Sequence, residues 1–79
     1  MSHFVYILQC ADNTLYVGYT TDIDRRLVEH NTSKLGARYT KARRPVTLKY
    51  SEKFETKGEA LKREYQLKQL SRGEKLELF

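Results

Sequence analysis

The chain has little cysteine and little histidine. Cys10 is the single cysteine among 79 residues, so no disulfide can form within the chain. Such usage is typical of a reducing compartment, and we expect a cytoplasmic location. Cys10 ends an apolar run, where a small buried residue is more common than a reactive thiol. One cysteine and two distant histidines, His3 and His30, lack the ligand spacing of a zinc site.

Long apolar runs and a basic N-terminal leader are missing as well. No stretch approaches the roughly 20 apolar residues that cross a membrane, and the first residues, MSHFVYILQC, do not resemble a signal peptide. We therefore expect a soluble protein without a membrane partner. The length fits one domain, residues 1–79, whose small core favours an open groove over a large enclosed pocket.

Lysine and arginine are absent from residues 1–24 and abundant in residues 25–49, where eight of them accompany a single acid, Glu29. The whole chain carries a net charge of +5. A concentrated basic segment favours a polyanionic partner, most simply nucleic acid, although a solvated basic face without a partner is the alternative. The candidate contacts combine cations for phosphates with one aromatic ring for stacking: Lys34, Arg38, Tyr39, Lys41, Arg43, Arg44 and Lys49.

Apolar periodicity predicts an α+β domain. Runs rich in Val, Ile, Tyr and Thr indicate strands at 3–10 and 14–20, joined by a turn at 11–13. A third strand at 46–54 alternates with one inward face. The predicted architecture is a three-stranded, mostly antiparallel sheet flanked by helices, in the order strand, strand, helix, strand, helix, with a short C-terminal helix.

Helix start signals complete this pattern. Thr56 with Glu59, and Ser71 with Glu74, form capping boxes for the last two helices. The expected helical ranges are 22–31, a short turn around 37–42, 57–70, and a few residues after 71.

The register of the first hairpin follows from its two faces. A loop with an odd number of residues pairs residue i with residue 24 − i, whereas a two-residue loop splits the apolar set. Because one face must be buried, we predict the odd loop. It gives one apolar face and one face with both tyrosines: Val5, Ile7, Leu15 and Val17 on the first, and Tyr6, Leu8, Tyr16 and Gly18 on the second. Gly18 weakens a strand, so we expect it to give clearance to a ligand or to the following helix.

Two charged residues lie beside apolar helical stripes. Glu64 falls within the expected inner face of Ala60, Leu61 and Leu67, where a carboxylate is costly unless it is paired or binds a cation. The alternative is an ion pair with Lys68, four residues later.

Arg26 lies next to the inner stripe of Ile23 and Leu27. It forms a surface ion pair with Asp22, worth well under about 1 kcal/mol, or it reaches over the tyrosine face.

Five side chains that can share one surface suit phosphodiester hydrolysis: Tyr6, Tyr16, Arg26, His30 and Glu64. Arg26 could neutralise a phosphate, and Glu64 could hold one Mg²⁺ or Mn²⁺ ion. A tyrosine could take a proton from water if nearby cations lowered its pKa, with His30 as a donor or relay. Tyrosines on strands are more often packing residues, so the residues alone leave both roles open.

The motifs resemble the GIY-YIG nuclease superfamily. Val5-Tyr6-Ile7 stands ten residues before Tyr16-Val17-Gly18, Arg26 lies ten residues after the second tyrosine, and His30-Asn31 and the segment ALKRE (60–64) follow. The resemblance implies that Tyr6 is a general base with Tyr16 close by, that Arg26 contacts the phosphate, and that Glu64 binds one divalent metal ion. In length and order the chain is similar to small stand-alone bacterial members and to the catalytic domain of structure-specific endonucleases.

The chain departs from that family in several places. Val5 replaces a glycine, Tyr19 stands where some members have lysine, and no asparagine follows Glu64. A second DNA-binding domain, which usually gives family nucleases their affinity, is not present in these residues. We therefore expect a monomeric, metal-dependent DNA endonuclease that is weak alone or needs a protein partner. The alternative is a non-catalytic nucleic-acid-binding module with a nuclease-like fold.

Overall fold

The computed structural model describes residues 1–32 and 37–79. Its elements, in chain order, are β1 (His3–Gln9), β2 (Leu15–Thr20), α1 (Ile23–Thr32), α2 (Arg38–Lys41), β3 (Thr47–Phe54), α3 (Lys57–Gln69) and α4 (Arg72–Leu76). This order confirms the predicted α+β arrangement and the short final helix. Within the described residues, no helix has the length and apolar character needed to cross a lipid bilayer.

Strand β1 is the centre of an antiparallel sheet with the order β2-β1-β3. Tyr6 lies opposite Gly18 and Leu8 lies opposite Tyr16, which is the predicted register of the odd loop. Asn13 in the turn has a left-handed φ of 67°, a conformation that asparagine tolerates better than most residues. Both tyrosines therefore project from the same face.

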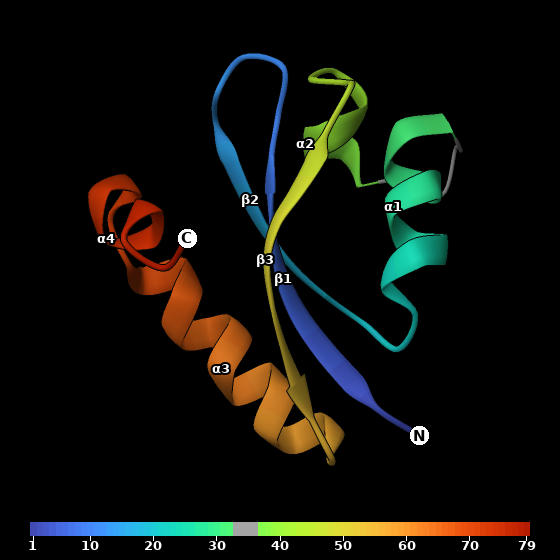
Figure 1. Cartoon of the computed structure of the whole chain (residues 1–79), viewed down its shortest axis with the longest axis vertical. Helices are drawn as coiled ribbons and strands as arrows, with labels where there is room; N and C mark the ends of the chain where they lie inside the picture. Colours follow the sequence, from blue (N-terminus) through green and yellow to red (C-terminus); the bar gives the residue numbers. More distant parts are fainter. Residues whose placement is uncertain (33–36) are drawn as a thin grey trace.

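The sheet separates two layers of helices, with α3 on one side of the strands and α1 and α2 on the other (Figure 1). The first face buries one cluster against α3: Val5, Ile7, Val17, Ala60 and Leu67. The second face buries another cluster, against which Leu27 of α1 packs: Tyr6, Leu8, Cys10 and Val46. The two faces of the hairpin thus serve different helices, and the tyrosines lie on the α1 side.

Strand β3 contributes to both faces because its pairing with β1 is irregular. Ile7 pairs with Tyr50 and Leu8 pairs with Leu48, so Lys49 is an extra residue in β3. Leu48 packs on the tyrosine face, whereas Tyr50 packs on the α3 face. The prediction of a single inward face for this strand was wrong, because an alternating sequence does not reveal where a bulge shifts the alternation.

Helix α3 is fixed by two buried residues and one ion pair. Ala60 and Leu67 are fully buried, but Leu61 is 40% exposed and does not belong to the inner face, contrary to the prediction. Arg63 donates from Nε to both carboxylate oxygens of Glu52 on β3, at 3.2 and 3.0 Å. These contacts set the rotation of α3 about its own axis.

Candidate active site

Tyr6 extends from β1 across Gly18 of the edge strand β2. A Cβ atom at Gly18 would lie 2.4 Å from the Tyr6 hydroxyl oxygen and 3.0 Å from the ring of Tyr16. Gly18 therefore makes room for the phenol of Tyr6, and neither of the two predicted occupants, a ligand or the following helix, uses this space. Tyr6 is 3% exposed, so its hydroxyl group needs a partner within the protein.

That partner is His30 of α1, whose Nε2 lies 2.8 Å from the Tyr6 hydroxyl oxygen. Burial and the neighbouring Tyr16 raise the pKa of Tyr6 to about 12, and the charge of Glu64 acts in the same direction. The guanidinium of Arg26 opposes them. At neutral pH, Tyr6 is a protonated phenol.

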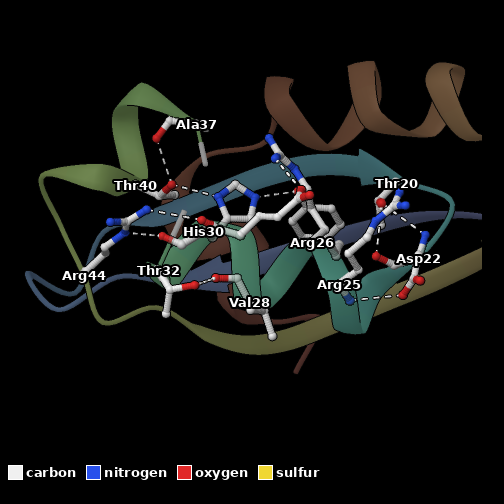
Figure 2. A network of polar contacts seen from close by, with 12 residues as sticks. Thr20, Asp22, Arg25, Arg26, Val28, His30, Thr32, Ala37, Thr40 and Arg44 are labelled. Carbon is white, nitrogen blue, oxygen red and sulfur yellow. Dashed lines mark hydrogen bonds and ion pairs between the residues drawn. The ribbon is translucent and has the colours of Figure 1, made fainter. Parts of the chain in front are cut away.

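The second ring nitrogen of His30 contacts the short helix α2. Its Nδ1 lies 2.7 Å from the hydroxyl oxygen of Thr40, and Thr40 donates to the carbonyl oxygen of Ala37 at 2.9 Å (Figure 2). His30 and Thr40 are both fully buried. Strand β1, helix α1 and helix α2 thus meet at a single imidazole ring.

His30 is neutral at neutral pH. Burial lowers its pKa to about 4, and the positive charges of Arg26 and Arg44 add to this effect, while Glu29 opposes it. A neutral imidazole keeps one nitrogen lone pair, so the ring can accept a proton.

Arg26 presents a cation beside the tyrosines. Among the described residues, Glu29 rather than Asp22 is the acid that pairs with it, at 3.0 Å. Asp22 instead caps α1 by accepting the backbone N–H of Arg25 at 3.1 Å. The Arg26 side chain is 25% exposed and lowers the pKa of Tyr6, so this cation is accessible to an anionic group and lies near the phenol.

Glu64 approaches from the opposite layer. Glu64 lies on α3, whose buried residues pack on the face away from the tyrosines. That Glu64 reaches over the tyrosine face together with Arg26 stays a prediction. The Glu64 carboxylate is 20% exposed and forms an ion pair with Lys68 at 3.5 Å, the alternative considered from the sequence. Its charge still contributes to the pKa of Tyr6.

The aromatic rings of Tyr16 and Tyr39 lie on one side of the site, with Tyr16 next to His30. The ring of Tyr16 is oriented edge to face to the imidazole of His30, with 5.3 Å between the ring centroids. It also stacks on the ring of Tyr39 of α2, with 5.9 Å between the centroids. The guanidinium of Arg43 lies 3.9 Å from the centre of the Tyr39 ring, and Arg43 also pairs with Asp12 at 3.0 Å. Tyr39 and Arg43 thus have structural partners within the domain.

The predicted nucleic-acid contacts differ in exposure. Arg38, Lys41 and Lys49 are exposed. Arg44, in contrast, donates to the backbone carbonyl oxygens of His30 at 2.5 Å and Glu29 at 3.2 Å (Figure 2). It therefore satisfies carbonyl groups at the C-terminal end of α1. Lys34 lies outside the described residues.

Two site-forming contacts were not predicted. Thr40 is the only buried residue of α2, and a four-residue helix has no apolar stripe that could indicate its direction. The side-chain amide of Asn31 bonds both backbone groups of Val46, at 3.1 and 2.7 Å. It joins the end of α1 to the start of β3. Neither contact has a signal in the sequence beyond the polar residue type.

The amino-acid sequence matches that of known proteins. A family model described as the GIY-YIG catalytic domain matches residues 2–77. The UPF0213 protein VNG_2274C of Halobacterium salinarum is 54% identical over 77 residues, which cover 98% of this chain and 99% of that protein. The UPF0213 protein SSP2268 of Staphylococcus saprophyticus is 55% identical over 76 residues, which cover 96% and 92%. The names of these relatives state no activity.

Two solved solution structures are similar as well. The UPF0213 protein BH0048 of Bacillus halodurans has a TM-score of 0.62 and 49% identity, with coverage of 99% of this chain and 82% of that one. The protein EF2693 of E. faecalis has a TM-score of 0.65 and 46% identity, with coverage of 99% and 83%. Both likenesses confirm the three-stranded fold with its flanking helices.

Proposed function

Because this chain belongs to the GIY-YIG catalytic-domain family, we propose that it is a divalent-metal-dependent endonuclease that hydrolyses phosphodiester bonds in DNA. The proposal rests mainly on the hydrogen bond between the buried phenol of Tyr6 and the neutral imidazole of His30, beside the cation of Arg26. A phenol that can pass its proton to a neighbour can accept one from water, and a guanidinium attracts phosphate.

In the proposed reaction, Arg26 binds a non-bridging oxygen of the scissile phosphate. A water molecule gives a proton to the Tyr6 oxygen while Tyr6 passes its own proton to Nε2 of His30. The water oxygen forms a new bond to phosphorus and the bond to the leaving oxygen breaks. The leaving oxygen takes a proton from solvent, and His30 returns its extra proton to solvent. Tyr6 need not become a free phenolate, a form that its pKa of about 12 disfavours.

Glu64 is the proposed ligand of one Mg²⁺ or Mn²⁺ ion. The described residues contain no group of three or more His, Cys, Asp or Glu side chains suited to a metal. A single carboxylate fits Mg²⁺, which often takes one or two carboxylates together with water and substrate oxygens. When bound, such an ion polarises the phosphate and stabilises the leaving oxygen. Lys68, whose side chain is 54% exposed, can move away from the carboxylate into solvent.

The exposed cations Arg38, Lys41 and Lys49 are the proposed contacts to the DNA backbone. Arg43 and Arg44 support the site from within, because both already contact groups of the protein. Three exposed cations make a small interface, so the proposal includes a protein partner that supplies substrate specificity.

One observation favours a second function, a nucleic-acid-binding module that does not cut. The ammonium group of Lys68 already pairs with the carboxylate of Glu64, which is the proposed metal ligand. If this pair persists in the presence of metal ions, the chain binds DNA without hydrolysing it.

The test is a cleavage assay with branched, flapped and linear DNA in Mg²⁺, Mn²⁺ or EDTA. We expect products with either metal ion and none with EDTA. Arg26→Ala and Glu64→Gln should each lower the rate by on the order of 100-fold or more, the usual effect of losing a charge-stabilising group.

Two matched substitutions control for charge and for contaminants. Arg25→Ala removes the exposed neighbouring arginine, and Glu55→Gln removes an exposed acid outside the site. Both variants should cut like the wild type. DNA that is shifted in a gel but never cut would leave the binding module as the function of this chain.

A further inference from the structure

Among the described residues, Thr40 forms a hydrogen bond with one side chain of the site, that of His30. It is fully buried on a helix whose other residues face solvent or the Tyr16 ring, and its hydroxyl oxygen has two partners. These are Nδ1 of His30 at 2.7 Å and the carbonyl oxygen of Ala37 at 2.9 Å (Figure 2). A buried hydroxyl with two short hydrogen bonds is a strong geometric constraint on the ring that it contacts.

The count of protons fixes the direction of each bond. A carbonyl oxygen can only accept, so the single hydroxyl proton of Thr40 points to Ala37. The lone pair of the same oxygen then faces His30, and Nδ1 must carry the proton of that bond. In the neutral ring, Nε2 is left with its lone pair, directed at the hydroxyl group of Tyr6.

We infer that Thr40 is a positioning residue, whose hydroxyl group holds His30 in the Nδ1–H tautomer so that Nε2 can accept the proton of Tyr6. The mechanistic part of this inference rests on the proposed function, whereas its geometric part concerns only the imidazole ring of His30 and its two partners. The Nδ1–H···O bond stays unchanged when Nε2 gains a proton, so the transfer from Tyr6 requires no rotation of the imidazole or of Thr40.

The opposite tautomer of His30 would reverse the direction of these hydrogen bonds. With the proton on Nε2, His30 would donate to the Tyr6 oxygen, and that nitrogen would have no lone pair to receive a proton. The hydroxyl group of Thr40, acting through His30, thus decides whether Tyr6 can relay a proton. A purely structural threonine would leave the tautomer unaffected by its removal.

The tautomer is measured by long-range ¹H–¹⁵N correlation spectra of the full chain, without any substrate. We expect the wild type to show a protonated Nδ1 and an unprotonated Nε2 for His30 at pH 7. Thr40→Val, which keeps the shape and removes the hydroxyl group, should populate the Nε2–H form. Thr40→Ser should restore the wild-type spectrum.

Cleavage should follow the same order. Thr40→Val should lower the rate by about 10- to 100-fold, the range for outer-shell partners that orient metal-bound histidines, and Thr40→Ser should recover most of it. The control is Thr32→Val on α1, which loses an exposed hydroxyl group that donates to the carbonyl oxygen of Val28. It should change neither the His30 tautomer nor the rate.

The outcomes separate this inference from the proposed function. An Nε2–H tautomer in the wild type, or an unchanged tautomer in Thr40→Val, overturns the inference whether or not the protein cuts DNA. If Thr40→Val does not fold, the wild-type and Thr40→Ser spectra still decide. The expected tautomers in a protein that cuts nothing would support the positioning by Thr40 and refute the nuclease.

Discussion

At the scale of single residues, Tyr6 combines two opposing demands. Burial raises its pKa to about 12, which keeps the phenol protonated, while Arg26 favours the phenolate. Glu64 adds to the upward shift, so neutralising this carboxylate with a bound cation would lower the pKa of Tyr6. The phenol therefore becomes a better proton donor to His30 when the proposed metal ligand is occupied.

Replacement of Tyr6 tests this role directly. Tyr6→Phe keeps the ring over Gly18 and removes the hydroxyl group that bonds to His30. We expect single-turnover cleavage to slow by about 10²- to 10⁴-fold, the usual contribution of general acid–base catalysis, with DNA affinity unchanged. Tyr65→Phe, at a tyrosine that is 68% exposed, is the control and should cut normally. Equal rates for both variants would remove Tyr6 from the mechanism.

At the scale of elements, the close contact between β1 and β2 at Gly18 positions the phenol. The Tyr6 ring occupies the space in which any other residue at position 18 would place a Cβ atom. The pairing of β1 with β2 therefore also determines the geometry of the site, since a change in the hairpin moves the side chain that contacts His30.

A pair of glycine substitutions tests this contact. Gly18→Ala should lower the free energy of unfolding by about 1–3 kcal/mol, because the new methyl group would lie 2.4 Å from the Tyr6 hydroxyl oxygen. Gly58→Ala in α3 has nothing within 4 Å of its new Cβ atom and should raise that free energy by about 0.5–1 kcal/mol. Urea unfolding of the two variants measures both changes. Similar shifts for the two would argue against a specific contact at Gly18.

The elements themselves were largely predictable, because their signals are local. The alternation in the hairpin gave the correct register between Tyr6 and Gly18, and the capping box at Ser71 has both of its hydrogen bonds. The bulge at Lys49 was not predictable, since it depends on which face β1 offers to β3. The periodicity of a sequence describes one helix or strand at a time and carries no information about how two strands pair.

The site was predictable by residue and less so by arrangement. The structure brings Tyr6, His30 and Arg26 together. The layer that carries Glu64 and the role of Thr40 depend on how the helices dock, which no spacing in the sequence reports. Sequence motifs indicated the candidate groups, whose catalytic roles stay predictions, and tertiary packing determined their neighbours.

At the scale of the whole molecule, the buried neutral His30 makes stability depend on pH. Its pKa is about 4 in the folded chain and about 6.5 in an unfolded one. Below pH 6.5 the unfolded chain binds a proton that the folded chain does not, so acid favours unfolding. This contribution to stability is fully present above pH 6.5 and is lost as the pH falls toward 4.

Urea unfolding between pH 7 and pH 5 measures this dependence. The free energy of unfolding should fall with decreasing pH, with a slope that approaches about 1.4 kcal/mol per pH unit. The charged groups around the ring are Arg26, Glu29 and Arg44. His30→Gln should flatten the slope, and His3→Gln, at the second histidine of the chain, should keep it. A slope that survives in His30→Gln would assign it to other groups.

The proposed reacting groups are spread along nearly the whole chain, with Tyr6 on the first strand and Glu64 on the third helix. During synthesis, Arg26, the proposed phosphate contact, therefore leaves the ribosome well before Glu64, the proposed metal ligand. On the proposed mechanism, a nascent or truncated chain that lacks α3 is inert toward DNA. On the same mechanism, cleavage would require α3 to dock on the sheet, so activity would arise only once the whole domain has folded.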